Sequence, residues 1–172
     1  MLRFFLFLTS LLLVSGISAQ NNMPLSNGII LPTSDSTIGS VNLQVIRKIH
    51  ERSGSIITAF RESGIASPDM EWWVIGPKDI LSFSGTFWGL EGVAEFQKRL
   101  NASFRYDKVK IVEYIDGVDQ IGVIFEGEGV ARMNERPFRS TILRLFTFHQ
   151  GKVIKVRNFF DTDAYTSALQ GR

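Results

Sequence analysis

The stretch KVKIVEYIDGVDQIGVIFEGEGVARMNERPFRSTILRLFTFHQGKVIKVRNFF, residues 108–160, decides the fold class. It contains four runs rich in β-branched and aromatic residues, and turn-forming residues separate one run from the next. We expect strands at 108–115, 121–132, 138–148 and 153–160. Because short turns join consecutive strands, this half of the chain predicts an antiparallel meander.

Upstream of this stretch the spacing of apolar residues is helical. Between Val41 and Ile49 they recur three and four residues apart, which indicates an amphipathic helix. A second short helix is expected to begin after the N-cap Ser55 and to stop at Gly64. A third amphipathic helix is expected at 90–100.

The segment between the second and third helices predicts a short hairpin. Residues 71–75 are rich in strand-forming side chains, and 80–83 are expected to pair back on them after Gly76-Pro77. We expect a loop at 85–89, and a polar tail after residue 160. Helices in the first half followed by strands in the second are typical of an α+β domain.

The N-terminus has the pattern of a signal peptide. In MLRFFLFLTSLLLVSGISAQ, residues 1–20, one Arg precedes an apolar run, and small residues follow it. We expect residues 1–19 to be a leader cleaved near Ala19, 20–40 a flexible linker and 41–172 one domain. The protein would then be secreted or periplasmic, with no stable membrane anchor after cleavage. The alternative is an uncleaved anchor, although the run is shorter than the about 20 residues of a spanning helix.

Composition excludes several classes of function. The 172 residues carry 19 basic and 17 acidic side chains, so no strongly basic surface is available for nucleic acid. The chain has no Cys, which excludes disulfides, thiolate nucleophiles and Cys-ligated metals. Its two His residues lack ligand spacing, and there is no phosphate loop, nucleophile elbow or dinucleotide fingerprint. We expect neither a metal nor a cofactor.

Several motifs resemble the SnoaL-like branch of the nuclear-transport-factor-2-like superfamily. They are Trp72-Trp73, SGTFWGLEGV at 84–93, Phe96, FTFHQGKV at 146–153 and NFFD at 158–161. The resemblance covers about Val41 to Asp163. It implies an α+β domain in which a curved antiparallel or mixed sheet wraps around a pocket, closed by three helices into a cone-shaped barrel.

The family includes polyketide cyclases, ketosteroid isomerases and proteins with no known reaction. Ketosteroid isomerases carry carboxylates on the first and penultimate strands, whereas the matching positions here fall near Val74 and at Arg144. Isomerase chemistry of that particular kind is therefore not expected.

The last hairpin predicts which side chains line the pocket. A three-residue loop at 149–151 would pair Phe148 with Lys152 and Arg144 with Val156. A two-residue turn at 150–151 is the alternative, but it would leave no clean apolar face. In the preferred register the pocket face carries Ser140, Ile142, Arg144, Phe146, Phe148, Ile154, Val156, Asn158 and Phe160.

The candidate catalytic residues are Arg144, Glu71 and His50. A guanidinium among apolar side chains needs a partner, which is either a ligand carboxylate or enolate oxygen or a structural ion pair with Glu126. Glu71 could be a general base if Trp73 faces inward. His50 is either an acid or base near neutral pH or a surface histidine.

The expected ligand-binding residues are mostly apolar. For Trp73 and Trp88 plain core packing is an equal alternative, and for Asn158 the alternative is a structural amide. The full set is Trp73, Trp88, Ile142, Phe146, Val156, Asn158 and Phe160.

Three functions fit these observations. The domain could be a cofactor-free cyclase, isomerase or lyase acting on an apolar carbonyl compound, a non-catalytic binding protein for a small apolar molecule, or a structural dimer with a vestigial pocket. The missing carboxylate pair favours binding over catalysis. We also expect a homodimer through the opposite sheet face, which carries Leu143, Leu145, Val153 and Phe159.

Overall fold

The structure, a computed structural model, describes residues 40–51 and 55–171. The expected leader and the expected linker up to residue 39 lie outside the described residues. Within the described part, no helix is both long and apolar enough to cross a membrane.

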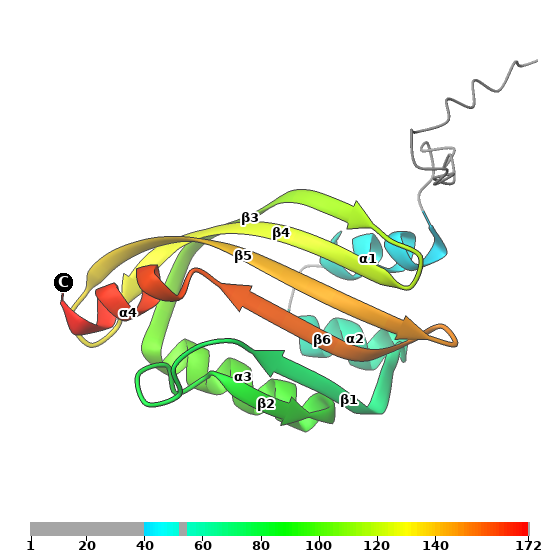
Figure 1. Cartoon of the computed structure of the whole chain (residues 1–172), viewed down its shortest axis with the longest axis horizontal. Helices are drawn as coiled ribbons and strands as arrows, with labels where there is room; N and C mark the ends of the chain where they lie inside the picture. The colour runs from blue at the N-terminus through cyan, green and yellow to red at the C-terminus, as the bar shows by residue number, and fades with distance from the viewer. Residues whose placement is uncertain (1–39, 52–54, 172) are drawn as a thin grey trace, which may run out of the picture. The chain divides into compact units, whose positions relative to one another are not determined.

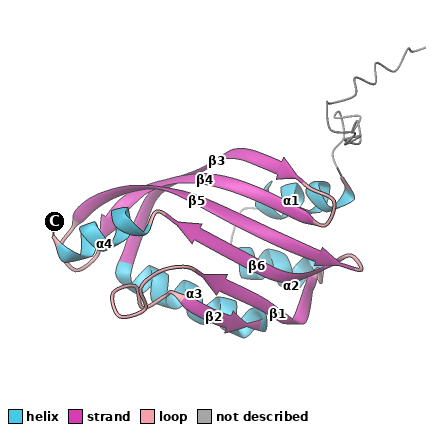
Figure 2. Ribbon diagram, viewed as in Figure 1, coloured by secondary structure: helices cyan, strands magenta, loops and turns pink. Residues whose placement is uncertain are grey.

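Six strands form one open mixed sheet in the order β2-β1-β6-β5-β4-β3, with helices before, between and after the strands (Figure 2). Strand β1 pairs in parallel with β6, and every other neighbouring pair is antiparallel. The predicted α+β class with a mixed sheet is confirmed, although the sheet does not close on itself. The elements are α1 (Val41–Glu51), α2 (Ile56–Ser63), β1 (Ala66–Val74), β2 (Gly85–Trp88), α3 (Gly89–Ser103), β3 (Phe104–Asp116), β4 (Gln120–Ala131), β5 (Arg136–His149), β6 (Lys152–Phe160) and α4 (Thr162–Gln170).

Helices α1, α2 and α3 lie on one face of the sheet (Figure 1), which we call the inner face. The predicted end signals of α2 are confirmed. The Ser55 side chain accepts a hydrogen bond from the Ile57 amide at 3.2 Å, and Gly64 ends the helix at φ 61°. Helix α1 buries Ile46 and Ile49, as its spacing predicted, but it buries Leu43 where Val41 was expected, and Val41 is exposed.

The predicted hairpin after β1 is wrong in its second strand. Residues Gly85–Trp88, expected as a loop, form β2 and pair with β1, so that Glu71 lies opposite Trp88. Residues 80–83 instead form turns, in which Leu81 and Phe83 are buried. Phe83 packs edge-to-face on Phe104, with ring centroids 6.0 Å apart. Residues 80–83 therefore pack into the core, whereas they were expected to pair with β1 as a strand.

The C-terminal residues, expected as a polar tail, form helix α4. The Asp161 side chain caps it by accepting a hydrogen bond from the Ala164 amide at 3.2 Å. Tyr165 anchors the helix, because its fully buried ring lies 4.9 Å from the rings of Phe104 and Phe138. One apolar anchor on a short helix was too weak a periodic signal to predict it.

The predicted register of the β5–β6 hairpin is also wrong. Gln150 and Gly151, at φ 49° and 73°, form a two-residue turn, and His149 lies opposite Lys152. The register then shifts next to Ile154, which is 39% exposed, while Val153 is buried. Beyond this bulge Arg144 lies opposite Asn158, where Val156 was expected.

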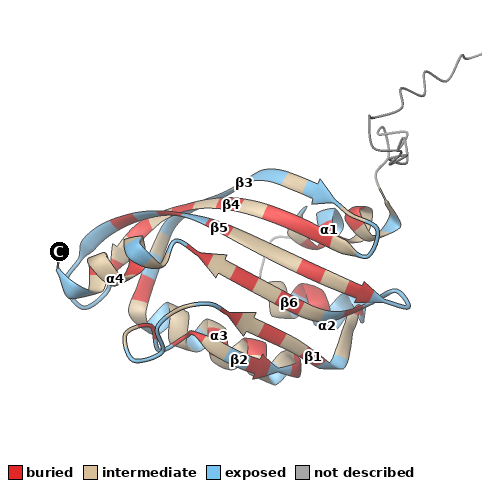
Figure 3. Cartoon of the chain, in the orientation of Figure 1, coloured by how far each residue is buried: buried red, intermediate tan, exposed pale blue. Residues whose placement is uncertain are grey.

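The turn is one residue shorter than predicted, and the bulge adds one residue to β6. Beyond the bulge, β6 therefore turns the same side chains inward as the predicted loop would have done. In Figure 3 buried and less buried residues alternate along much of β4, β5 and β6, except for a buried run at 121–123 and a half-buried run at 143–145. The inner face carries the expected residues with Val153 in place of Ile154: Ser140, Ile142, Arg144, Phe146, Phe148, Val153, Val156, Asn158 and Phe160.

Candidate functional site

Arg144, on β5, is a cation held among aromatic side chains on the inner face. Its guanidinium carbon lies 5.0 Å from the ring centroid of Trp72 and 5.2 Å from that of Phe125. Burial lowers the pKa of Arg144 to about 10, and the group remains positively charged at neutral pH. No carboxylate among the described residues forms an ion pair with it.

Asn158 fixes the orientation of this guanidinium. The Arg144 Nε donates a hydrogen bond to Asn158 Oδ1 at 2.8 Å, and Asn158 Nδ2 donates to the Trp73 carbonyl at 3.0 Å. Asn158 is fully buried, and these two bonds use both the oxygen and the nitrogen of its amide. The partner of Arg144 is thus a neutral acceptor, and the site keeps its net positive charge.

His50, at the end of α1, reaches the same group of rings. Its imidazole lies 5.4 Å from the Phe125 ring centroid and 6.0 Å from that of Phe146. The expectation of a surface histidine is wrong, because Nε2 is buried and has no hydrogen-bond partner in the structure. Burial, reinforced by the charge of Arg144, lowers the pKa of His50 to about 4.

Among residues 40–51 and 55–171, two buried side-chain atoms on the inner face have no hydrogen-bond partner. These are His50 Nε2, on a ring packed against Phe125, and Trp72 Nε1, in the indole that covers Arg144. Buried polar atoms in native proteins are nearly always hydrogen-bonded. His50 Nε2 and Trp72 Nε1, both in rings near Arg144, are exceptions to that rule.

Two tyrosines extend the polar region toward α4. The hydroxyls of Tyr106, on β3, and Tyr165, on α4, are hydrogen-bonded to each other. Gly127 makes room for the Tyr106 ring, because a Cβ at this position would lie 2.9 Å from the ring Cε1. Burial raises the pKa of both hydroxyls, to about 12 for Tyr165, and keeps them protonated.

The structure places the other predicted site residues on both faces. Ile142, Phe146, Val156 and Phe160 are buried on the inner face, on the same strands as Arg144 or Asn158. Trp72 faces inward, and Trp73 lies on the outer face with its ring 5.6 Å from Phe159.

The predicted base Glu71 and the predicted ligand contact Trp88 also lie away from Arg144. Glu71 forms an ion pair with Lys155 at 2.9 Å on the outer face, beside Trp73. The condition set for Glu71 as a base, an inward Trp73, is therefore not met. Trp88 is 62% exposed. Sequence reasoning missed Trp72, since the doublet alone does not tell which tryptophan faces inward.

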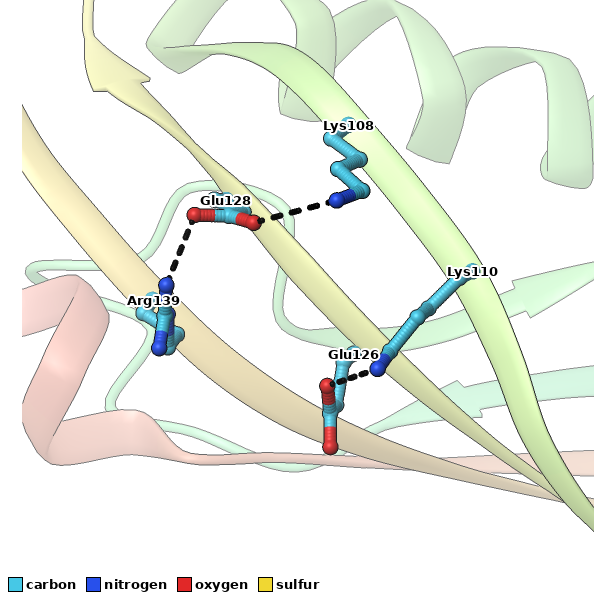
Figure 4. A pocket seen from close by; sticks show the side chains of 5 residues that line it. All are labelled: Lys108, Lys110, Glu126, Glu128 and Arg139. Carbon is cyan, nitrogen blue, oxygen red and sulfur yellow. Dashed lines mark hydrogen bonds and ion pairs between the residues drawn. The ribbon is translucent and has the colours of Figure 1, made fainter.

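The predicted ion pair between Arg144 and Glu126 is wrong. Figure 4 shows Glu126 in a pocket on the outer face, together with Lys108, Lys110, Glu128 and Arg139. Glu126 pairs with Lys110 at 2.9 Å, and Glu128 pairs with Arg139 at 3.0 Å. Both carboxylates of this pocket are thus paired on the outer face, and Arg144 is left with its neutral partner Asn158.

No side-chain cluster in the described ranges has the composition of a metal site. In particular, three or more His, Asp or Glu residues do not come together there.

The fold is that of nuclear-transport-factor-2-like proteins. A protein of unknown function from Burkholderia pseudomallei K96243 with this fold is 19% identical, covers 76% of this chain and 98% of its own, and superposes with a TM-score of 0.63. No family model matches the sequence, and no curated protein matches it.

Two further solved structures have the same fold. A protein from Jannaschia sp. CCS1, described as a SnoaL-like polyketide cyclase, is 19% identical, covers 80% of this chain and 96% of its own, and has a TM-score of 0.63. TerC, co-crystallized with polyporic acid, is 20% identical, covers 76% of this chain and 99% of its own, and has a TM-score of 0.58. The predicted resemblance is confirmed at the level of the fold.

Proposed function

We propose that this domain binds a small, largely apolar molecule on its inner face and holds one electron-rich oxygen of that molecule at Arg144. The observation that carries the proposal is a guanidinium among aromatic rings whose described protein partner is the neutral amide of Asn158. A buried charge is costly unless it is paired and hydrogen-bonded. A carboxylate or enolate oxygen from a ligand would supply the missing negative charge.

The surroundings of Arg144 suit the rest of such a molecule. Phe125, Phe146 and Val156 are apolar and buried close to it along the sheet. The indole Nε1 of Trp72 is buried without an acceptor in the structure described and is a further donor in this region. That TerC was co-crystallized with polyporic acid supports small-molecule binding as a use of this fold.

The test compares Arg144→Met with the matched control Arg139→Met. Arg139 lies on the same strand but is exposed on the outer face, where it pairs with Glu128. We expect the first variant to weaken benzoate binding by about 1.5–3 kcal/mol, the contribution of a charge-assisted hydrogen bond, and the control to bind as the wild type does.

Thermal melts of the same samples separate a binding role from a structural one. Arg144→Met strands the buried acceptor Asn158 Oδ1, so the fold should persist with a loss of at most about 1–3 kcal/mol. A variant that melts far below the wild type would make Arg144 structural. A variant that binds benzoate as the wild type does would refute the proposal.

Catalysis of a cofactor-free cyclase, isomerase or lyase type is the second candidate. The neutral imidazole of His50 beside Arg144 favours it, because one group could take a proton while the other stabilises an oxyanion. The SnoaL-like protein from Jannaschia, described as a polyketide cyclase, adds support from a shared fold. Hydrogen–deuterium exchange at the α-carbon of 2-tetralone tests it, and exchange no faster than in buffer would count against catalysis.

A further inference from the structure

The tautomer of His50 is fixed by its backbone contact. Its Nδ1 lies 2.9 Å from the carbonyl oxygen of Ile46, one helical turn earlier. A carbonyl oxygen only accepts, so Nδ1 must carry the hydrogen and donate it. In the neutral ring Nε2 then has a lone pair and no hydrogen.

The bare nitrogen has no hydrogen-bond partner among the described residues. Nε2 is buried without a hydrogen-bond partner, and the rings around it, those of Tyr114, Phe125 and Phe146, turn toward the imidazole at steep angles. Leaving a buried acceptor unpaired costs about 1–3 kcal/mol. Protonation does not relieve this cost near neutral pH, because burial holds the pKa of His50 at about 4.

His50 and Arg144 both contact Phe125, from α1 and β5 respectively. The shared ring therefore brings a neutral acceptor and a cation to one part of the inner face. A molecule between them needs a hydrogen-bond donor for Nε2 and an oxygen with negative charge for the guanidinium. A purely apolar acid satisfies only the second of these groups.

We propose that His50 Nε2 accepts a hydrogen bond from a hydroxyl of the ligand, and that the ligand class is hydroxylated aromatic or cyclic acids and enols. This inference rests on the proposed binding at Arg144 and adds a second point of recognition to it. Arg144 selects for the anionic oxygen, and His50 selects the hydroxylated members of the class.

The test uses benzoate and the ortho, meta and para isomers of hydroxybenzoate, titrated at neutral pH into the full chain. In the wild type at least one isomer should bind about three- to tenfold more tightly than benzoate, the ratio expected of one hydrogen bond. In His50→Phe, which keeps a ring and removes the acceptor, that ratio should fall to about one. His50→Gln restores an acceptor and should recover part of the ratio, and His149→Gln, at an exposed position, should leave it unchanged.

The outcomes distinguish this inference from the function on which it rests. If benzoate binding depends on Arg144 but no isomer gains from its hydroxyl, the role of His50 is overturned and the binding function stands. An advantage that survives in His50→Phe also overturns it, because the hydroxyl is then bound elsewhere. If none of the four acids binds to the wild type, both the proposed binding function and the role of His50 are refuted.

Discussion

Replacing His50 by Phe should make the domain more resistant to acid. Burial and the charge of Arg144 lower the pKa of His50 from 6.5 to about 4 in the folded state. Between these two values the unfolded chain binds a proton at this position and the folded chain does not. The wild type therefore loses stability as the pH falls from 6.5 toward 4. This lowering of the pKa corresponds to about 3 kcal/mol at most, lost by pH 4.

The measurement is urea unfolding of the wild type and His50→Phe at a series of pH values between 7 and 4. The two proteins should have similar free energies of unfolding at neutral pH, because Phe keeps the ring contacts with Phe125 and Phe146. The loss of the Nδ1 hydrogen bond to Ile46 offsets the removal of the unpaired Nε2. At pH 4 the variant should be the more stable by up to about 3 kcal/mol. The control His149→Gln should follow the wild type throughout. Parallel pH profiles for the wild type and His50→Phe would refute the assignment of a buried, neutral imidazole.

Three further predictions follow from the structure and the sequence. We expect a homodimer through the outer face, so light scattering should give twice the chain mass for the wild type and a smaller mass for Leu143→Glu. A wild type that is monomeric at micromolar concentration would contradict this. Tyr165→Phe removes the buried partner of the Tyr106 hydroxyl and should cost about 1–3 kcal/mol in urea unfolding, while an unchanged midpoint would mean that this contact is replaceable. Exported protein should begin near residue 20, and N-terminal sequencing that starts at Met1 would rule out cleavage near Ala19.

The long strands and the helix ends could be predicted from the sequence because their signals are local. The four predicted strands at 108–160 correspond to β3, β4, β5 and β6, and each differs from the observed strand by a few residues at its ends. Ser55 and Gly64 act through their own side chain or backbone, so that their roles as caps needed no knowledge of the tertiary fold. Strand β2 was not predicted because it is only four residues long and has a glycine at each border. Gly85 is its first residue, and Gly89, the first residue of α3, follows its last.

The site depended on contacts that the local sequence does not encode. The inner-face residues were nearly right despite a wrong turn, because the bulge at Ile154 offset the one-residue difference in the loop. The pairing of β1 with β6 decides that Trp72 faces Arg144 and Trp73 does not, and this parallel pairing joins residues about 85 positions apart. His50 lies on an amphipathic helix whose own sequence does not show that this position packs against the sheet. Its burial depends on the contact with Phe125 of β4.

The binding of a ligand oxygen by Arg144 is the central claim, and a crystal structure of the protein soaked with benzoate tests it most directly. We expect electron density for benzoate on the inner face, with a carboxylate oxygen within hydrogen-bonding distance of the Arg144 guanidinium and the ring against Phe125. Soaked crystals of Arg144→Met should lack that density. Benzoate bound on the outer face, or an inner face without benzoate in crystals of the wild type, would contradict the account.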